Sequence, residues 1–490
     1  MIIVQNGLDN ERGLRTFINM FFKTDDDLSV FSNFEYKDKK INVYTVIYFE
    51  NKKYTEDYYL DFDTENKSEK LINKVFKAAC ANSFVHAAMK IQNINLPWGS
   101  MCGIRPAKNV RELSEDGLNE NEIREMFETV YEVSPDKTEL AMTVAENEKE
   151  ILKNIGKNSV GIYIGIPFCP TRCLYCSFVS TDMKFSAKYM NDFCDKLVLE
   201  IEKTAEIIEK LGVYVESIYI GGGTPTALDN ENLKKVLENV NRFFDLENLK
   251  EFTLEAGRAD TITREKLDTA KKYGVTRISI NPQTMNDVTL KKVGRMHMAD
   301  DVKKCFYMAR EAGFENINMD LIAGLPDEDF DMFKYSLDEV ADLNPDDITV
   351  HTMCVKHGAR LKNTKVEFTE SETMNKMLAY TQAKMKKTGR IPYYMYRQKN
   401  MVGNLENVGY AYPDKMSAYN ISIMEEKQTI IALGGGGSTK VVTGDDIIRI
   451  YNYKDPKEYI DKFENILERK DEILKIGGLH NGGSGKENNK

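Results

Sequence analysis

Three cysteines in the first half of the chain have a spacing that suits an iron–sulfur cluster. Cys169, Cys173 and Cys176 are separated by three and then by two residues. A [4Fe–4S] cluster has four irons, and each cysteine thiolate binds one of them. Three cysteines therefore leave one iron without a protein ligand, so that a small molecule can bind there. The spacing predicts a cluster that does chemistry at its open iron rather than one that only transfers electrons.

The same triplet has two simpler interpretations. Free cysteines are often small core residues, and three of them could belong to a zinc site that takes a fourth ligand from elsewhere. The cluster is favoured because the triplet directly follows a predicted strand at 161–166, and because Pro167 and Pro170 oppose a helix there. The remaining cysteines are scattered. Cys194 and Cys305 fall on apolar sides of predicted helices, and no role follows for Cys80, Cys102 and Cys354.

Length and composition limit the classes of protein to which the chain can belong. Its 490 residues, 42% of them hydrophobic, have room for two or three domains with full cores. The net charge of -10 and the lack of a long basic block argue against nucleic acid as the main partner. The chain shows neither a signal-peptide pattern nor an apolar run of about 18 residues, so we expect no membrane span. An oxygen-sensitive cluster and free thiols suit a reducing cytosol, so we expect a cytoplasmic protein.

The N-terminal part is predicted to form an accessory α+β domain over residues 1–155. Residues 42–49 and 58–62 alternate between apolar and polar side chains, as strands do. Residues 69–92 have apolar side chains at helical spacing. The segment 96–108, which holds the only tryptophan, is rich in Gly and Pro and is predicted to be a loop.

Residues 156–390 alternate between strand and helix patterns, which predicts an α/β partial (βα)6 barrel. Active sites of such folds lie at the carboxyl ends of the strands. Residues 391–476 are predicted as a small C-terminal segment, and 477–490, rich in Gly, Asn, Ser and Lys, as a disordered tail. The predicted strands are 161–166, 217–221, 251–256, 277–281, 316–322 and 347–353, and the helices are 186–211, 230–244, 263–273, 300–312, 328–342 and 370–388.

The strand ends carry residues that suit the ligand of a radical S-adenosylmethionine (SAM) enzyme, a class whose CxxxCxxC signature the cysteines match. The glycine turn 221–223, followed by Thr224, allows backbone to approach a ligand closely. Glu255 ends an apolar strand, where its carboxylate can hold the ammonium of SAM. Asp320, among apolar residues, needs a partner such as an adenosine hydroxyl. Gln283 and Arg295 are further polar residues at or after the fourth strand. His351 and His357, near the sixth strand, are possible site residues, but structural roles are favoured for these two histidines.

Together these segments resemble the oxygen-independent coproporphyrinogen III oxidase (dehydrogenase) family, the HemN-like radical SAM proteins. The resemblance covers about residues 160–440. The N-terminal region, the Cys-Ser-Phe end of the cysteine loop and the segment 396–401 look most like the HemZ-type branch. The resemblance rests on Tyr163-Ile-Gly-Ile-Pro-Phe-Cys169, Gly221-Gly-Gly-Thr-Pro-Thr226, Glu255, the segment with Gln283 and Arg295, and Asn318-Met-Asp-Leu-Ile-Ala-Gly-Leu-Pro326.

This resemblance assigns roles to the site residues. It implies that Cys169, Cys173 and Cys176 bind the cluster. Cluster-bound SAM would contact Tyr163, Gly222, Glu255 and Arg295. Positions that hold a second SAM in the family are Tyr175, Gly223, Thr224, Gln283 and Asp320, and the glycine run 434–437 with Ser438 matches a loop near them.

Two positions depart from the family's oxidases. A histidine often stands two residues after the tyrosine, where this chain has Gly165. A fourth cysteine often stands two residues after the third, where this chain has Phe178. The cluster ligands are unaffected, but the number of bound SAM molecules, one or two, stays open.

The activity that the resemblance implies is oxidative decarboxylation of coproporphyrinogen III to protoporphyrinogen IX, a step of anaerobic porphyrin (haem) biosynthesis. A 5′-deoxyadenosyl radical would take hydrogen from a propionate β-carbon, and loss of CO2 and an electron would leave a vinyl group. A flavodoxin or ferredoxin would donate electrons, and Arg172 and Arg397 are considered as propionate ligands.

Two alternatives remain. One is a haem chaperone, but the His-Asn-x-x-Tyr-Trp motif of such relatives corresponds here to Tyr419-Asn-Ile-Ser-Ile-Met424, without a histidine. The other is a radical SAM methyltransferase or haem-degrading enzyme that acts on a tetrapyrrole. Product analysis would separate these activities from decarboxylation.

Overall fold

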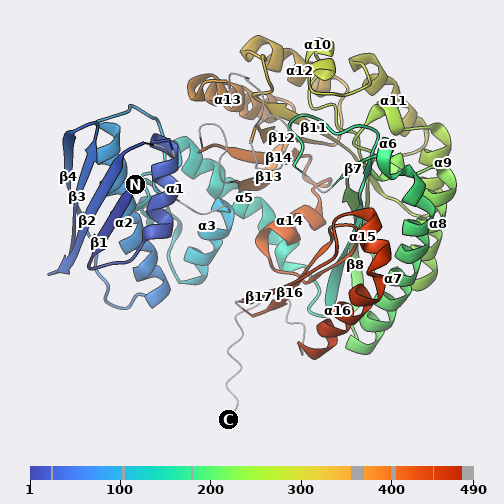
Figure 1. Cartoon of the computed structure of the whole chain (residues 1–490), viewed down its shortest axis with the longest axis horizontal. Coiled ribbons are helices and arrows are strands. Elements are labelled where there is room, and N and C mark those ends of the chain that lie inside the picture. Colours follow the sequence, from blue (N-terminus) through green and yellow to red (C-terminus); the bar gives the residue numbers. More distant parts are fainter. Residues whose placement is uncertain are drawn as a thin grey trace. The chain divides into compact units, whose positions relative to one another are not determined.

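The chain forms two compact units in the computed structural model (Figure 1). The first unit consists of Met1–Ala145 and Met395–Glu406, and the second of Glu146–Tyr394 and Asn407–Lys490. Within the part of the chain that the structure describes, none of the helices has both the length and the apolar character needed to cross a bilayer. The structure describes residues 1–23, 26–101, 105–177, 180–354, 369–398, 404–444 and 446–476.

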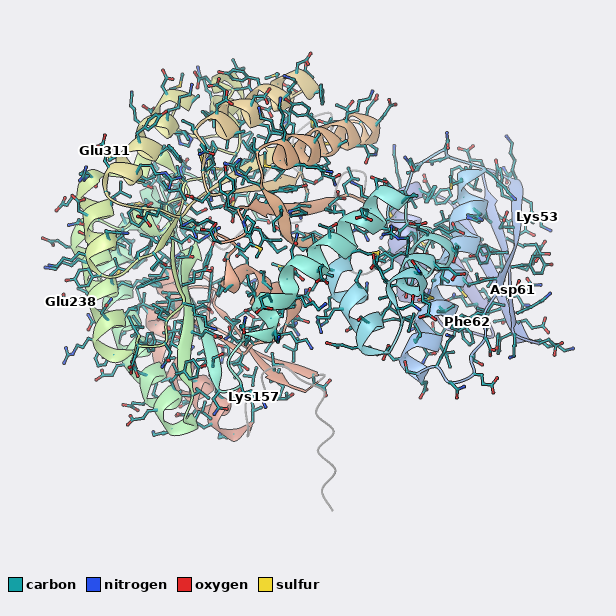
Figure 2. The ribbon with its side chains drawn as sticks, turned by 180° about the vertical axis from the view of Figure 1, so that it is seen from behind. Lys53, Asp61, Phe62, Lys157, Glu238 and Glu311 are labelled. Atoms are coloured by element: carbon teal, nitrogen blue, oxygen red, sulfur yellow. The ribbon has the colours of Figure 1, made fainter. Side chains whose placement is uncertain are left out.

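The first unit is built on a four-stranded sheet in the order β1-β2-β3-β4. The strands and helix predicted near 42–62 and 69–92 are present as β3 (Lys40–Phe49), β4 (Lys52–Asp61) and α2 (Glu69–Met89). Lys53 and Asp61, labelled in Figure 2, lie on the edge strand β4. Elements that the sequence analysis did not predict are β1 (Ile2–Asn6), α1 (Glu11–Phe21), β2 (Leu28–Lys37), α4 (Glu120–Glu125) and η1 (Met126–Val130). The helix α3 (Pro106–Glu115) also belongs to this unit, and α5 (Pro135–Lys153) begins in the first unit and ends in the second.

Six parallel strands in chain order form the centre of the second unit. Each matches a predicted strand within a few residues, so the expected mixed α/β fold is confirmed. The intervening helices cover the outer side, where Glu238 and Glu311 point into solvent (Figure 2). The strands are β5 (Ser159–Ile166), β8 (Tyr214–Gly222), β9 (Glu251–Glu255), β10 (Arg277–Ser279), β11 (Ile317–Ala323) and β12 (Asp347–Thr352); the helices are α7 (Met190–Leu211), α8 (Asn230–Phe243), α9 (Arg264–Lys272), α11 (Ala299–Glu311), α12 (Phe330–Asp342) and α13 (Ser371–Lys387).

The C-terminal segment extends this sheet at both edges. β15 (Ile430–Gly434) pairs in parallel with β5, and β14 (Glu406–Ala411) pairs antiparallel with β12. Gly434 is the register partner of Gly165, so the glycine run 434–437 begins at the carboxyl end of β5. The other C-terminal elements are β13 (Ile391–Arg397), α14 (Ala418–Glu425), β16 (Ser438–Thr443), β17 (Asp446–Tyr451), α15 (Pro456–Asp461) and α16 (Phe463–Lys475).

Candidate active site

Strand register places the predicted polar residues on one face of the sheet. Side chains of register partners, and of residues two apart on a strand, share a face. By this rule Tyr163 shares a face with Tyr219, its partner on β8. The same face continues through β9, β10, β11 and β12, and the side chains on it that stay partly exposed include Tyr163, Tyr219, Glu255, Asp320 and His351. We call this the polar face.

The cysteine loop that follows β5 is held by contacts with two other strand ends. The Thr171 hydroxyl donates to the Gly294 carbonyl at 2.8 Å, and the Leu174 amide donates to the Val293 carbonyl at 3.0 Å. Arg258 donates through Nη1 to the Thr171 carbonyl at 2.9 Å. These contacts join the loop to the segments after β9 and β10, and so fix its path across the sheet edge.

The surroundings of the thiols suit an iron–sulfur cluster. Cys169 and Cys173 are each 8% exposed. Burial raises the pKa of Cys169 to about 11. The Thr224 hydroxyl, 3.3 Å from the Cys169 Sγ, partly opposes this shift because it stabilises the thiolate. The Arg258 Nη1 lies 3.9 Å from the Cys173 Sγ, and hydrogen bonds to sulfur tune such clusters.

No three His, Cys, Asp or Glu side chains among the described residues converge as ligands of a single metal ion would. A cubane does not require that, because each thiolate binds a different iron. Three thiols on one anchored loop, with a hydroxyl and a guanidinium beside them, fit the cluster. Iron binding must remove the thiol protons, so loading is favoured by higher pH.

Arg258 is a residue that the sequence analysis did not single out as functional. It is 2% exposed and pairs with Asp260 at 2.8 Å while it holds Thr171. Lysine lacks the planar guanidinium group of arginine, so it cannot keep all of these contacts. We therefore expect Arg258→Lys to lower iron retained per chain after anaerobic reconstitution by about half or more, by analogy with the weakening caused by loss of supporting groups at metal sites. Arg264→Lys, on the exposed face of α9, is the control; equal iron in both variants would contradict the role given to Arg258.

Glu255 and Tyr219 form a tight pair on the polar face. The Tyr219 hydroxyl donates a short hydrogen bond to Glu255 Oε1. Burial raises the pKa of Glu255 to about 7, and the nearby Asp320 carboxylate adds to this shift, whereas the Tyr219 hydroxyl and the Gly222 amide oppose it. A carboxyl group that titrates near neutral pH beside a glycine turn is a good receptor for a ligand ammonium group.

Asp320 is held in its ionised form by neighbours on β11 and β12. Burial opposes ionisation, but hydrogen bonds with His351 and Asn318 outweigh it and lower the pKa of Asp320. The Asn318 amide donates to Asp320 Oδ1 at 2.8 Å, and His351 Nε2 lies 3.6 Å from Asp320 Oδ2. His351 therefore lies on the polar face, beside the predicted site residue Asp320.

Gln283 is a strained residue at the end of β10. Its φ of 69° lies in the left-handed region, which costs non-glycine residues about 1–3 kcal/mol. Its amide donates to the Asp320 carbonyl and its carbonyl accepts from the Ile322 amide, both at 2.9 Å. The buried Oε1 has no hydrogen-bond partner among the described residues. Strain and an unsatisfied buried oxygen are typical of a ligand site.

Arg295 contacts Tyr175 of the cysteine loop. Arg295 donates through Nη1 to the carbonyls of Asn281, at 2.5 Å, and Gly257, at 3.1 Å, and through Nε to the Tyr175 hydroxyl at 3.2 Å. Burial opposes the charge of Arg295, but attraction to Tyr175 and Cys173 outweighs it and raises the pKa of Arg295. Its charge thus lies close to the cysteine loop.

Two glycine turns flank the loop and leave no room for side chains. A Cβ on Gly223 would lie 2.7 Å from the Phe168 carbonyl oxygen and 3.1 Å from the Cys169 Sγ. A Cβ on Gly165 would lie 2.6 Å from the Gly435 carbonyl oxygen. The histidine position of the family's oxidases is therefore packed here against the C-terminal glycine turn.

Replacing Gly165 by histidine is expected to damage the site rather than restore an oxidase feature. The turn that carries Gly435 must move to admit a side chain, at a cost of about 1–3 kcal/mol for overpacking. We expect a lower melting temperature and weaker SAM binding, measured by thermal unfolding and anaerobic dialysis. Gly274→Ala is the control, because a side chain is strained at its φ of 84° although its Cβ would meet open space; it should lower the melting temperature and leave SAM binding unchanged. Normal stability with tighter SAM binding would contradict this packing.

Some predicted residues lie elsewhere or outside the described residues. Arg397 belongs to the first unit, where it is 4% exposed and donates to the carbonyls of Met101, at 2.7 Å, and Asn404, at 3.2 Å. The structure therefore gives Arg397 a packing role within that unit. Arg172 stays in the cysteine loop. Phe178, His357, Cys102 and the tail 477–490 lie outside the described residues.

Known proteins provide an independent comparison. The model of the Radical SAM superfamily matches residues 163–340. The oxygen-independent coproporphyrinogen-III oxidase-like protein HemZ of Bacillus subtilis is 37% identical over 420 residues, which cover 84% of each chain. The heme chaperone HemW of Bacillus subtilis is 36% identical over 197 residues, which are 40% of this chain and 50% of HemW.

A solved structure agrees in fold. Coproporphyrinogen III oxidase HemN from Escherichia coli, a radical SAM enzyme, aligns with a TM-score of 0.52 and 22% identity over 66% of this chain and 73% of HemN. This likeness shows the fold, and the similarity to HemZ over most of both chains shows the family. The family implies a [4Fe–4S] cluster and SAM. The chain belongs to the HemN-like family of radical SAM proteins.

Proposed function

We propose that this protein is a radical SAM oxidoreductase that decarboxylates coproporphyrinogen III propionates to vinyl groups and so yields protoporphyrinogen IX. The observation that carries the proposal is the polar face, with Tyr163, Glu255 and Asp320 beside a cysteine loop that has three thiols. The relative HemZ supports the substrate class because its name refers to coproporphyrinogen-III oxidase. Its similarity covers 84% of this chain and so includes parts of both compact units.

Each residue has a task in this proposal. Cys169, Cys173 and Cys176 would hold the cluster, and when bound the cluster and SAM would supply the hydrogen-abstracting chemistry. Glu255 would hold the ammonium group of SAM, since its carboxylate lies beside the glycine turn after β8.

The remaining proposed contacts orient the ligand and limit water. Asp320 would accept hydrogen bonds from ligand hydroxyls, with Asn318 and His351 fixing its carboxylate. Tyr163 and Tyr219 stack with ring centroids 6.2 Å apart and would close the floor of the site. A dry, oriented site places the propionate β-carbon for hydrogen transfer and prevents loss of the radical to solvent.

The chaperone alternative is less well supported. Where chaperone relatives carry a histidine, Tyr419 is 3% exposed and stacks on Tyr219 with centroids 4.6 Å apart. That side chain packs in the core and has no imidazole to offer a haem iron. The similarity to the HemW of Bacillus subtilis covers 40% of this chain and that to the HemW of Buchnera aphidicola 64%, against 84% for HemZ.

An anaerobic turnover assay tests the proposal. The reconstituted protein receives SAM, a low-potential reductant, coproporphyrinogen III and cell extract as a source of electron acceptor, and 5′-deoxyadenosine and porphyrin mass are followed together. We expect loss of two CO2 units per porphyrin, together with 5′-deoxyadenosine formation. Cleavage of SAM with an unchanged porphyrin mass would reject this substrate. A methylated or ring-opened product would instead identify one of the other tetrapyrrole activities.

A further inference from the structure

A buried carboxylate on α7 binds the C-terminal glycine turn. Glu200 is fully buried, and its Oε2 accepts hydrogen bonds from the Gly434 amide at 2.8 Å and the Tyr459 hydroxyl at 2.6 Å. Its Oε1 accepts from Asn452 Nδ2 at 2.7 Å and lies 3.2 Å from Lys470 Nζ. One carboxylate therefore joins α7 to β15, to α15 and to α16.

The partners of Glu200 also hold the turn directly. The Asn452 side chain donates through Nδ2 to the Gly434 carbonyl at 3.0 Å, and its backbone N–H donates to the Gly437 carbonyl at 2.9 Å. Lys470, 1% exposed, donates to the Ala432 carbonyl. The turn from 434 to 437 is thus held at Gly434 by the side chains of Glu200 and Asn452, and at Gly437 by the Asn452 backbone.

This turn is in close contact with Gly165 and Pro167, which lead into the cysteine loop. The Gly435 amide donates to the Gly165 carbonyl at 2.9 Å. A Cβ on Gly434 would lie 2.3 Å from the Gly165 carbonyl oxygen, and one on Gly435 would lie 2.7 Å from the Pro167 ring. Gly165 and Pro167 stand between Tyr163 and Cys169, so a shift of the turn must shift the start of the loop.

We propose that Glu200, paired with Lys470, is a positioning residue that holds the 434–437 turn against Gly165 and Pro167 and thereby fixes the entry of the cysteine loop for SAM binding. This inference rests on the radical SAM part of the proposed function and does not depend on the tetrapyrrole substrate. A buried ion pair is weak evidence for a role in stability alone, because apolar residues can often replace it without loss. Here the carboxylate also binds the Gly434 amide, which an apolar replacement cannot do.

The first test compares Glu200→Gln with a matched control. Glutamine keeps the shape of the Glu200 side chain, but its NH2 group replaces an oxygen that accepts hydrogen bonds from donors such as the Gly434 amide or Asn452 Nδ2. The control is Glu406→Gln, the same substitution in the equally buried Lys137–Glu406 pair of the first unit, whose Nζ and Oε1 atoms lie 2.6 Å apart. We expect Glu200→Gln to weaken SAM binding about tenfold or more, as loss of a hydrogen bond to a charged group does. Glu406→Gln should lower the melting temperature comparably and leave SAM affinity within about twofold.

Two further measurements keep the test decisive. Amide hydrogen exchange of Gly434 and Gly435 in the cluster-free protein should speed up in Glu200→Gln and not in Glu406→Gln. The double variant Glu200→Gln/Lys470→Met removes the unpaired charge, so it should recover stability but not SAM affinity or amide protection. Recovery of all three together, or equal losses of SAM affinity in both single variants, would overturn the proposal. Because SAM binding and amide exchange need no porphyrin, a wrong substrate would leave these outcomes unchanged.

Discussion

Replacing Cys173 by alanine is expected to abolish cluster binding and reductive SAM cleavage together. Two thiolates remain, but a second iron then lacks a protein ligand, and the site is left with the Arg258 charge 3.9 Å from the former sulfur position. We expect SAM cleavage to fall by about 10³-fold or more, since the cofactors carry this chemistry. Iron content, the electron paramagnetic resonance of the reduced protein and 5′-deoxyadenosine yield check the result.

The control for this variant is another buried free cysteine. Cys194 lies on α7 and is fully buried. Cys194→Ala should leave a small cavity and cost some stability while it keeps iron and SAM cleavage. Full iron loading in Cys173→Ala, or equal loss of iron in both variants, would reject the three-cysteine cluster site.

SAM binding is expected to tighten about tenfold between pH 6 and pH 8 through the ionisation of Glu255. Burial raises the pKa of this carboxyl group to about 7, so it is mostly neutral at the lower pH and mostly charged at the higher one. Only the charged form attracts the SAM ammonium strongly, and binding follows the charged fraction. Anaerobic equilibrium dialysis across this range measures the change.

Glu255→Gln is the matched variant because it keeps shape and removes the titration. Its SAM affinity should be lower, and any pH dependence left in it belongs to SAM or to other groups. The raised pKa of Glu255 also affects the free energy of unfolding. The neutral carboxyl group contributes stability that is fully present below the ordinary pKa of 4.5 and is lost as the pH rises through about 7. Identical pH profiles in both proteins would show that Glu255 does not hold the ammonium.

Local pattern was sufficient to predict the six central strands. Residues 161–166 predict β5 because Ile162, Ile164 and Ile166, all fully buried, alternate with Tyr163 and Gly165. The strand ends were then predictable as a site, because parallel strands bring their carboxyl ends to one edge. The same reasoning could not find β1, α1 and β2, which precede the clearer alternation of β3.

Other parts of the site depend on contacts between distant residues. Arg258 stands three positions after Glu255, but nothing in its neighbours along the chain indicates that it reaches Thr171. Tyr219 could have been noticed two residues before the glycine turn on β8, yet its pairing with Glu255 required the register of two strands. His351 comes close to Asp320 only because β12 lies beside β11 in the sheet.

The sequence by itself predicted the three candidate cluster ligands, and it determined the order of the βα units and the residues at their ends, because these depend on spacing along a few residues and on strand periodicity. The tertiary structure decided how the C-terminal glycine turn meets Gly165, and how Glu200 and Lys470 hold it. These contacts join residues more than two hundred positions apart. Their energies depend on burial and on the close approach of backbones, which no local pattern encodes.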